Sequence, residues 1–155
     1  MKRVLLTGAA GFIGRQTIAP LIARGYEVHA VSSKNRSQEK GDVHWYKVDL
    51  LQIEELEGLI RKIMPAHLLH FAWCTEPGKY WTSPENFQWL TASVALLQAF
   101  AKAGGKRVVM AGSCAEYDWN FGNCDEQKTP LHPATIYGHC KDSLRNMLES
   151  FSSEA

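Results

Sequence analysis

The stretch LLTGAAGFIGRQ, residues 5–16, places Gly8, Gly11 and Gly14 three residues apart behind a short apolar run. The run predicts a buried strand, and the apolar spacing after the glycines predicts a helix. In a strand-turn-helix unit the first glycine permits the tight turn, the second lets backbone approach a pyrophosphate, and the third lets helix and strand pack closely. The glycines therefore predict a phosphate site at a helix N-terminus. A glycine turn that holds no ligand is the alternative.

Strands and helices alternate along the rest of the chain. Helices are predicted over residues 13–22, 53–63, 83–101 and 135–151, and strands over residues 3–6, 27–31, 43–48, 67–72 and 108–112. The connections are too long for hairpins, so the strands should be parallel, with helices on both faces of a doubly wound sheet. The predicted fold class is α/β.

Composition excludes several classes of protein. With 155 residues and 45% hydrophobic content, the chain is predicted to form one domain over residues 1–155. A net charge of +1 gives little attraction for nucleic acid, and the sequence has no stretch long and apolar enough for a membrane span and no secretory signal. We therefore expect a cytoplasmic protein. The four cysteines lack metal-ligand spacing, which argues against a metal site and against a disulfide framework.

Further motifs follow the glycines in order. Asp49-Leu50 follows the third predicted strand, His70-Phe71-Ala72 ends the fourth, and Ser113 stands four residues before Tyr117. YGHCK then places Tyr137 four residues before Lys141. With TGAAGFIG, which has GxxGxxG in place of GxGxxG, these motifs closely resemble the extended short-chain dehydrogenase/reductase family of sugar-nucleotide epimerases, dehydratases and ketoreductases.

The resemblance covers the whole chain and implies a Rossmann-type NAD(P)-binding domain. We expect an incomplete sheet of about five strands that lacks the C-terminal substrate domain of the family. The resemblance and the glycine spacing together predict these cofactor-binding residues: Gly8, Gly11, Phe12, Ile13, Gly14, Ser32, Ser33, Lys34, Arg36, Asp49, Leu50, Phe71, Ala72, Trp73, Tyr137 and Lys141.

The catalytic residues that the resemblance implies are Tyr137, Lys141 and Ser113. Tyr137 and Lys141 are four residues apart in a predicted helix, so their side chains share a face. The pKa of free tyrosine is about 10, so acid/base work near neutral pH needs about 4 kcal/mol of phenolate stabilisation. A lysine ammonium and a cationic nicotinamide are the expected sources. In the family the tyrosine exchanges a proton with a substrate oxygen, which the serine orients.

The end of the second predicted strand bears on the choice of cofactor. NAD-preferring enzymes place an acid there to hold the ribose 2′-hydroxyl, whereas this chain has Ser32. Ser33, Lys34 and Arg36 offer hydroxyls and cations to a 2′-phosphate. We therefore expect NADP in preference to NAD, with a solvated polar loop as the alternative interpretation.

Residues at other positions indicate which reactions of the family are favoured and where this chain departs from the family pattern. Family dehydratases carry an Asp-Glu pair after the active-site serine or threonine, but this chain has Cys114-Ala115, which favours ketoreduction or epimerisation. Trp89 replaces an asparagine that is usual in the family's long helix, and Trp73 stands where a small residue is common. His70 is predicted to be a buried strand histidine with a satisfied ring rather than a general base.

Two functional hypotheses follow. The first is an NAD(P)-dependent oxidoreductase or epimerase acting on a nucleotide-linked sugar. The second is an NAD(P)-binding module without turnover, because the substrate region of the family is not present in the sequence. The resemblance also implies a homodimer formed through the long helix and the YxxxK helix.

Overall fold

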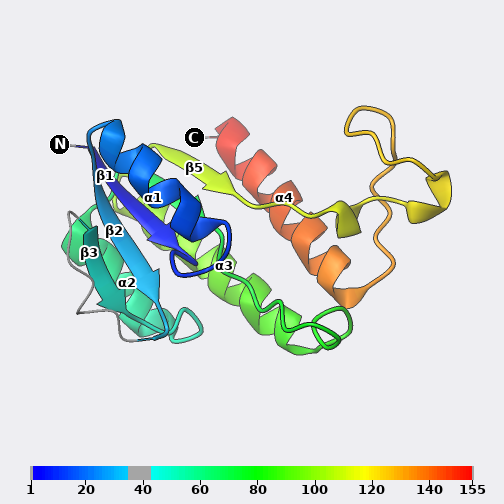
Figure 1. The fold of residues 1–155 in the computed structure, drawn as a ribbon, viewed down its shortest axis with the longest axis horizontal. Helices are drawn as coiled ribbons and strands as arrows, with labels where there is room; N and C mark the ends of the chain where they lie inside the picture. The colour runs from blue at the N-terminus through cyan, green and yellow to red at the C-terminus, as the bar shows by residue number, and fades with distance from the viewer. Residues whose placement is uncertain (1, 35–42, 155) are drawn as a thin grey trace. The chain divides into compact units, whose positions relative to one another are not determined.

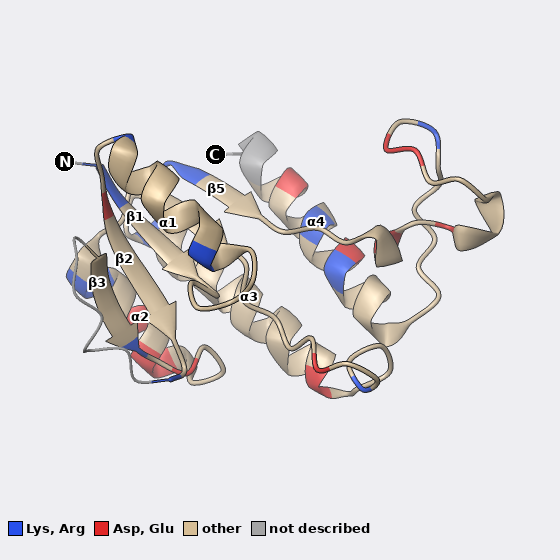
Figure 2. Ribbon diagram, in the orientation of Figure 1, with Lys and Arg blue, Asp and Glu red and all other residues tan. Residues whose placement is uncertain are grey.

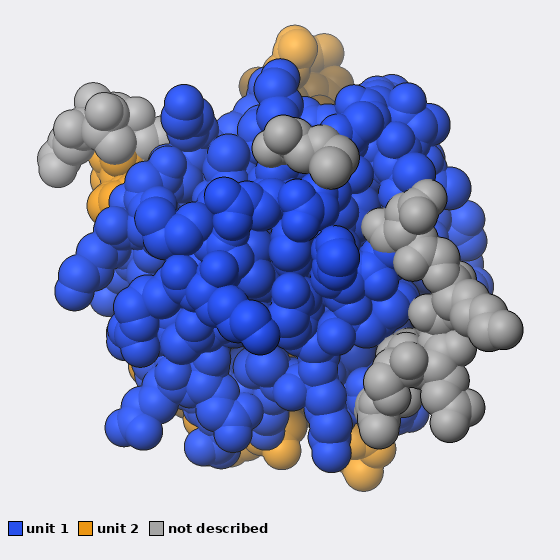
Figure 3. Space-filling model, turned by 90° about the vertical axis from the view of Figure 1, so that its left-hand side faces the viewer, with its two compact units in different colours: residues 1–73, 94–111 blue, residues 74–93, 112–155 orange. Residues whose placement is uncertain are grey.

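The computed structural model describes residues 2–34 and 43–154, with side chains to residue 151. The chain divides into two compact units, which Figure 3 colours separately. Unit 1 comprises residues 1–73 and 94–111, and unit 2 comprises residues 74–93 and 112–155. The prediction that residues 1–155 form one domain stays a prediction.

Unit 1 is built on a parallel sheet of five strands, in the order β3-β2-β1-β4-β5. The α/β fold class and the parallel sheet predicted from the sequence are therefore confirmed. The strands are β1 (Lys2–Thr7), β2 (Tyr26–Ser32), β3 (Val43–Lys47), β4 (His67–His70) and β5 (Arg107–Met110). Three helices contribute to this unit: α1 (Gly14–Ala23), α2 (Ile53–Ile63) and the second half of α3 (Glu85–Lys102).

Helices α1 and α2 cover opposite faces of the sheet (Figure 1). On one face, Ile18 and Leu21 of α1 pack against a buried cluster that includes Val4 and Val28. On the other face, α2 places the ammonium group of Lys62 5.9 Å from the ring centre of Tyr46 in β3. The sheet is therefore doubly wound, as a parallel sheet with right-handed crossovers requires.

Strand β4 is shorter than the predicted strand over residues 67–72. Its neighbour β1 ends at Thr7, and the chain then turns away at Gly8, which has a φ of 65°. One further bond, from the N–H of Phe71 to the carbonyl of Thr7 at 3.3 Å, is made before β4 loses its partner. Strand β5 is likewise shorter than predicted, because β4 ends at His70.

Unit 2 contains the first half of α3, two short 3₁₀ helices and the long helix α4. Their bounds are η1 (Cys114–Glu116), η2 (Trp119–Phe121) and α4 (Ile136–Glu154). Thr135 precedes α4, and its hydroxyl accepts a hydrogen bond from the N–H of Gly138 at 3.0 Å. This side-chain cap satisfies one of the free donors of the first turn and fixes where α4 begins.

Charged residues of both signs are interspersed along the elements, including α4 (Figure 2). The counts are nearly balanced, with 17 lysines and arginines against 16 aspartates and glutamates. Within residues 2–34 and 43–154, none of the helices has the length and apolar character needed to cross a membrane. A cytoplasmic location stays a prediction.

Candidate functional site

The glycine turn of unit 1 has the close backbone contacts that the sequence predicted. A Cβ atom at Gly8, whose φ is 65°, would lie 2.7 Å from the amide nitrogen of Ala72. A Cβ atom at Gly14 would lie 2.8 Å from the carbonyl carbon of Gly8 and 2.9 Å from the Cα of Ala9. Real Cβ atoms do not approach so closely, so Gly8 serves the turn and Gly14 serves the packing of α1 onto it.

Gly11 differs from its two neighbours, because the space on its outer side is open. It is exposed, and an added Cβ atom would lie close to one atom only, the carbonyl oxygen of Gly8 at 3.1 Å. Its N–H donates to that same oxygen at 2.9 Å, which closes the turn. A ligand can therefore reach the Gly11 backbone directly, as close approach of a pyrophosphate requires.

The N-terminus of α1 favours an anion. Ile13 occupies the cap position without a side-chain hydrogen bond to the helix, and the first turn contains no acidic residue. The guanidinium carbon of Arg15 lies 5.5 Å from the centre of the Phe12 ring, and the Phe12 side chain is 78% exposed. The helix dipole and a nearby cation both attract negative charge here.

The strand ends beside the turn carry the other candidate cofactor residues of unit 1. Strands β2, β1 and β4 are parallel neighbours, so the residues after their carboxyl ends lie along one edge of the sheet. Ser32 ends β2, and its hydroxyl accepts a hydrogen bond from the N–H of Lys34 at 3.1 Å. Ser33 and Lys34 are exposed, whereas Arg36 lies outside the described residues.

Asp49 and Leu50 follow β3. A carboxylate oxygen of Asp49 accepts from the N–H of Leu51 at 3.1 Å, and Leu50 is buried. Phe71, Ala72 and Trp73 follow β4 and are each half-buried. The structure thus brings the glycine turn close to Phe71 and Ala72, while Asp49 and Leu50 lie after the edge strand of the sheet.

His70 has the structural role that the sequence favoured. It is buried, and its Nδ1 lies 2.6 Å from the hydroxyl oxygen of Thr7. The same hydroxyl accepts from the N–H of Ala72 at 3.4 Å. Thr7, which the sequence analysis did not single out, therefore ties the end of β1 to the end of β4.

The predicted catalytic residues come together within unit 2. The Ser113 side chain is near enough to the phenol of Tyr137 to lower its pKa by hydrogen bonding. Tyr137 lies in the first turn of α4, with Lys141 one turn further along the same face. Tyr137 is 8% exposed and Lys141 is 6% exposed. A hydroxyl, a phenol and an amine thus form one small polar cluster.

Aromatic side chains surround the Tyr137 ring. The ring centres of Tyr80 and Trp81 lie 4.9 Å and 5.7 Å from that of Tyr137, both in edge-on geometry. The N–H of Tyr137 also donates to the carbonyl of Trp81 at 3.2 Å. Asn86 of α3 is buried and donates to the carbonyl of Tyr80 at 2.7 Å, which holds this loop in place.

Burial dominates the electrostatics of the cluster. It raises the pKa of Tyr137, and the negative charge of Glu116 acts in the same direction, whereas the hydrogen bond with Ser113 lowers it. Burial lowers the pKa of Lys141, while the charge of Glu116 raises it. The protein groups together therefore oppose the phenolate form that the sequence analysis expected Lys141 to favour.

Two residues that the sequence analysis missed assemble the cluster. A Cβ atom at Gly138 would lie 2.9 Å from the Cβ of Pro133 and 3.2 Å from the carbonyl carbon of Ala115, so only glycine lets η1 approach α4. Glu116 accepts from the N–H of Ser113 at 2.7 Å and fixes the turn that carries the serine. In the sequence, the Ser-x-x-Glu spacing that is typical of a capping box could have indicated this role of Glu116.

A protein-family comparison agrees with this arrangement. The model of the NAD dependent epimerase/dehydratase family matches residues 4–155. This chain belongs to that family. The resemblance to the extended short-chain dehydrogenase/reductase enzymes that the motifs indicated is thus confirmed.

Individual relatives cover nearly all of this chain. A UDP-glucose 4-epimerase of Bacillus subtilis is 26% identical over 94% of this chain and 46% of its own length. A dTDP-6-deoxy-L-talose 4-dehydrogenase (NAD(+)) of Aggregatibacter actinomycetemcomitans is 28% identical over 97% of this chain and 55% of its own. The solved structure of Thermus thermophilus UDP-glucose 4-epimerase in complex with NAD superposes with a TM-score of 0.80 at 26% identity, over 98% of this chain and 51% of that one. This family member thus spans about half the length of these relatives.

Proposed function

We propose that this chain is the NAD(P)-binding and proton-transferring part of an oxidoreductase or epimerase acting on a nucleotide-linked sugar. The observation that carries the proposal is the close packing of η1 on α4 at Gly138, which brings the Ser113 turn to the start of α4, where Tyr137 and Lys141 are both buried. The names of the Bacillus subtilis and Aggregatibacter actinomycetemcomitans relatives support a nucleotide-linked sugar as the substrate class.

Unit 1 has the backbone geometry that a dinucleotide needs. The open side of Gly11 and the uncapped N-terminus of α1, with Phe12 and Ile13, would hold the pyrophosphate. Asp49 and Leu50 would contact the adenine, and residues 71–73 would line the cofactor. A bound nicotinamide dinucleotide supplies the hydride donor or acceptor and, when oxidised, a positive charge.

In unit 2 each polar side chain has a distinct role. The phenol oxygen of Tyr137 gives a proton to, or takes one from, a sugar oxygen that the Ser113 hydroxyl orients. The ammonium of Lys141 would lower the free-energy cost of the phenolate and would bind the ribose hydroxyls of the coenzyme. The sequence has no carboxylate at Cys114 or Ala115, so we propose ketoreduction or epimerisation rather than dehydration.

We further propose a preference for NADP. Ser32, Ser33 and Lys34 offer two hydroxyls and one cation at the end of β2, and the sequence places no carboxylate among them. The named dehydrogenase relative and the solved Thermus thermophilus complex use or contain NAD. Paired titrations with NADH and NADPH therefore decide this preference.

The raised pKa of Tyr137 favours a second candidate function, which is an NAD(P)-binding module without turnover. A phenol that burial keeps protonated is a poor base near neutral pH.

As the quaternary structure we propose a homodimer through α3 and α4. The homodimer is supported by exposed apolar side chains on these helices, namely Phe87, Met147 and Phe151. Sedimentation velocity measures the oligomeric state and tests this proposal.

The deciding experiment combines binding and turnover. NADPH and NADH fluorescence titrations are followed by turnover assays with UDP- and dTDP-linked 4-keto sugars. In Tyr137→Phe, turnover should fall about 10²- to 10⁴-fold because the acid/base group is lost, with coenzyme affinity changed little. Tyr117→Phe removes a hydroxyl from the same unit and is the matched control. Coenzyme binding without any turnover in the unmodified protein would favour the module.

A further inference from the structure

Unit 2 contains a buried carboxylate that the proposed chemistry does not use. Glu116 ends η1 and is 4% exposed. One of its oxygens accepts from the N–H of Ser113 at 2.7 Å, while the Ser113 hydroxyl accepts from the N–H of Ala115 at 3.2 Å. These reciprocal bonds close the turn that holds the serine. The turn needs an acceptor at this position, but it does not need a negative charge.

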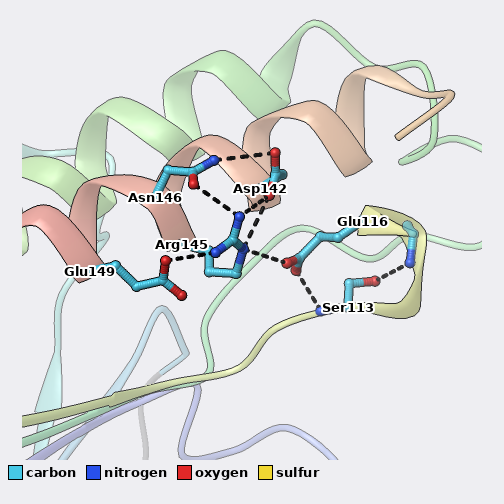
Figure 4. A network of polar contacts seen from close by, with 7 residues as sticks. Ser113, Glu116, Asp142, Arg145, Asn146 and Glu149 are labelled. Atoms are coloured by element: carbon cyan, nitrogen blue, oxygen red, sulfur yellow. Dashed lines mark hydrogen bonds and ion pairs between the residues drawn. The ribbon is translucent and has the colours of Figure 1, made fainter. Parts of the chain in front are cut away.

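The second oxygen of Glu116 faces α4. It lies 3.8 Å from Nε of Arg145, and Figure 4 shows the carboxylate between the Ser113 turn and this arginine. Arg145 already has closer anionic partners in Asp142, at 2.7 Å, and Glu149, at 2.8 Å. Arg145 therefore shares its positive charge among three carboxylates and offsets the burial of Glu116 only in part, so that burial still raises the pKa of Glu116.

Lys141 is a second cation that acts on Glu116. Tyr137, Lys141 and Arg145 follow one another at intervals of four residues, so they line one face of α4. Glu116 raises the pKa of Lys141 against the effect of burial, and Lys141 in turn lowers the pKa of Glu116. The two groups are therefore electrostatically coupled across the contact between η1 and α4.

We propose that Glu116 is a positioning residue of the active site: its carboxylate fixes the Ser113 turn and keeps Lys141 an ammonium beside Tyr137. The inference rests on the proposed function. The other titratable groups that act on this cluster are Tyr80 and Cys114, which raise the pKa of Tyr137, and Asp142 and Arg145, which act on Glu116 in opposite directions.

The first test reads the cluster without any turnover. Carbon-13 NMR titrations follow the Tyr137 phenol and the Lys141 ε-carbon in Glu116→Gln, which keeps a hydrogen-bond acceptor but loses the charge. The pKa values of both groups should fall, because Glu116 raises both. The control is Glu149→Gln, which removes a carboxylate from Arg145 at the exposed end of the network and should leave both values unchanged. Unchanged values in Glu116→Gln would overturn the proposal.

The reciprocal variant keeps the test decisive if Glu116→Gln does not fold. In Lys141→Met the pKa of Glu116, read from its side-chain carbon, should rise, while Lys128→Met should leave it unchanged. No change in the pKa of Glu116 would contradict the coupling.

With sugar substrate, kcat in Glu116→Gln should fall about tenfold and its pH profile should shift to lower pH, with Glu116→Asp partly restoring the profile. If the unmodified protein shows no turnover, the proposed function fails while the titrations still judge the coupling.

Discussion

The glycine turn of unit 1 and the Ser113-Tyr137 cluster of unit 2 are built by different means. The turn depends on backbone alone: Gly8 and Gly14 pack against main-chain atoms, and Gly11 leaves its outer side open. The cluster depends on side chains from two segments, η1 and α4, and on a buried charge. The geometry of the glycine turn therefore follows from residue size, whereas the Ser113-Tyr137 cluster needs contacts between segments that are distant in the sequence.

This difference predicts which substitutions affect folding and which affect only function. In unit 1 the tolerance of a glycine to a side chain depends on the space beside it. In unit 2 it depends on whether two packed segments stay in contact. Four substitutions test this distinction, ordered here from the largest expected effect to the smallest.

Gly8→Ala should destabilise unit 1 by about 2–5 kcal/mol. The φ of 65° costs about 1–2 kcal/mol for a non-glycine residue, and collision with the Ala72 backbone adds about 1–3 kcal/mol. Gly25→Ala is the matched control, since Gly25 has a φ of 75° but nothing within 4 Å of its Cβ position. Urea unfolding of both variants measures the difference, and equal losses would show that φ alone matters.

Gly11→Val should leave the protein folded but reduce coenzyme affinity by about 100-fold or more. Its Cβ position is tight against one backbone oxygen only, yet a branched side chain there fills the space that a pyrophosphate would occupy. Fluorescence titration with NADPH and NADH measures the loss, with urea unfolding as the control for folding. Unchanged affinity in the folded variant would refute the pyrophosphate assignment.

Gly138→Ala should destabilise unit 2 by about 1–3 kcal/mol and reduce turnover further than this loss explains. The new methyl group would overlap the backbone of Ala115 and push η1, with Ser113, away from Tyr137. Gly58→Ala in α2 is the control, because nothing lies within 4 Å of its Cβ position. There alanine should stabilise the helix by about 0.5–1 kcal/mol. Thermal unfolding measures the change in stability of each variant, and the two changes should have opposite signs. The turnover assay measures the additional loss of activity in Gly138→Ala.

Lys34→Ala should have the smallest effect, a loss of NADPH affinity of about tenfold or less with little change for NADH. The exposed ammonium would contact only the 2′-phosphate, and exposed charge pairs contribute little. Lys79→Ala, at an exposed lysine of unit 2, is the control. Equal losses for the two coenzymes would contradict the NADP preference.

The sequence predicted the elements well because their signals are local. Glycine spacing located the turn after β1, and apolar spacing located the helices and strands to within a few residues. Strands β4 and β5 were predicted too long, because a strand ends where its neighbour leaves the sheet, which no local pattern records. Gly138 was read only as part of YGHCK, since the closeness of Ala115 and Pro133 is a tertiary fact.

The sequence by itself determined the α/β alternation, the glycine turn and the spacing of Tyr137 and Lys141, because each depends on neighbours within one or two turns of chain. Only the tertiary structure decided that Glu116 and Lys141 are coupled, that Tyr80 and Trp81 flank Tyr137, and that burial raises the pKa of the phenol. Desolvation and Coulomb interactions depend on distance in space, and for these groups that distance is set by how η1, α4 and the loop before α3 pack together.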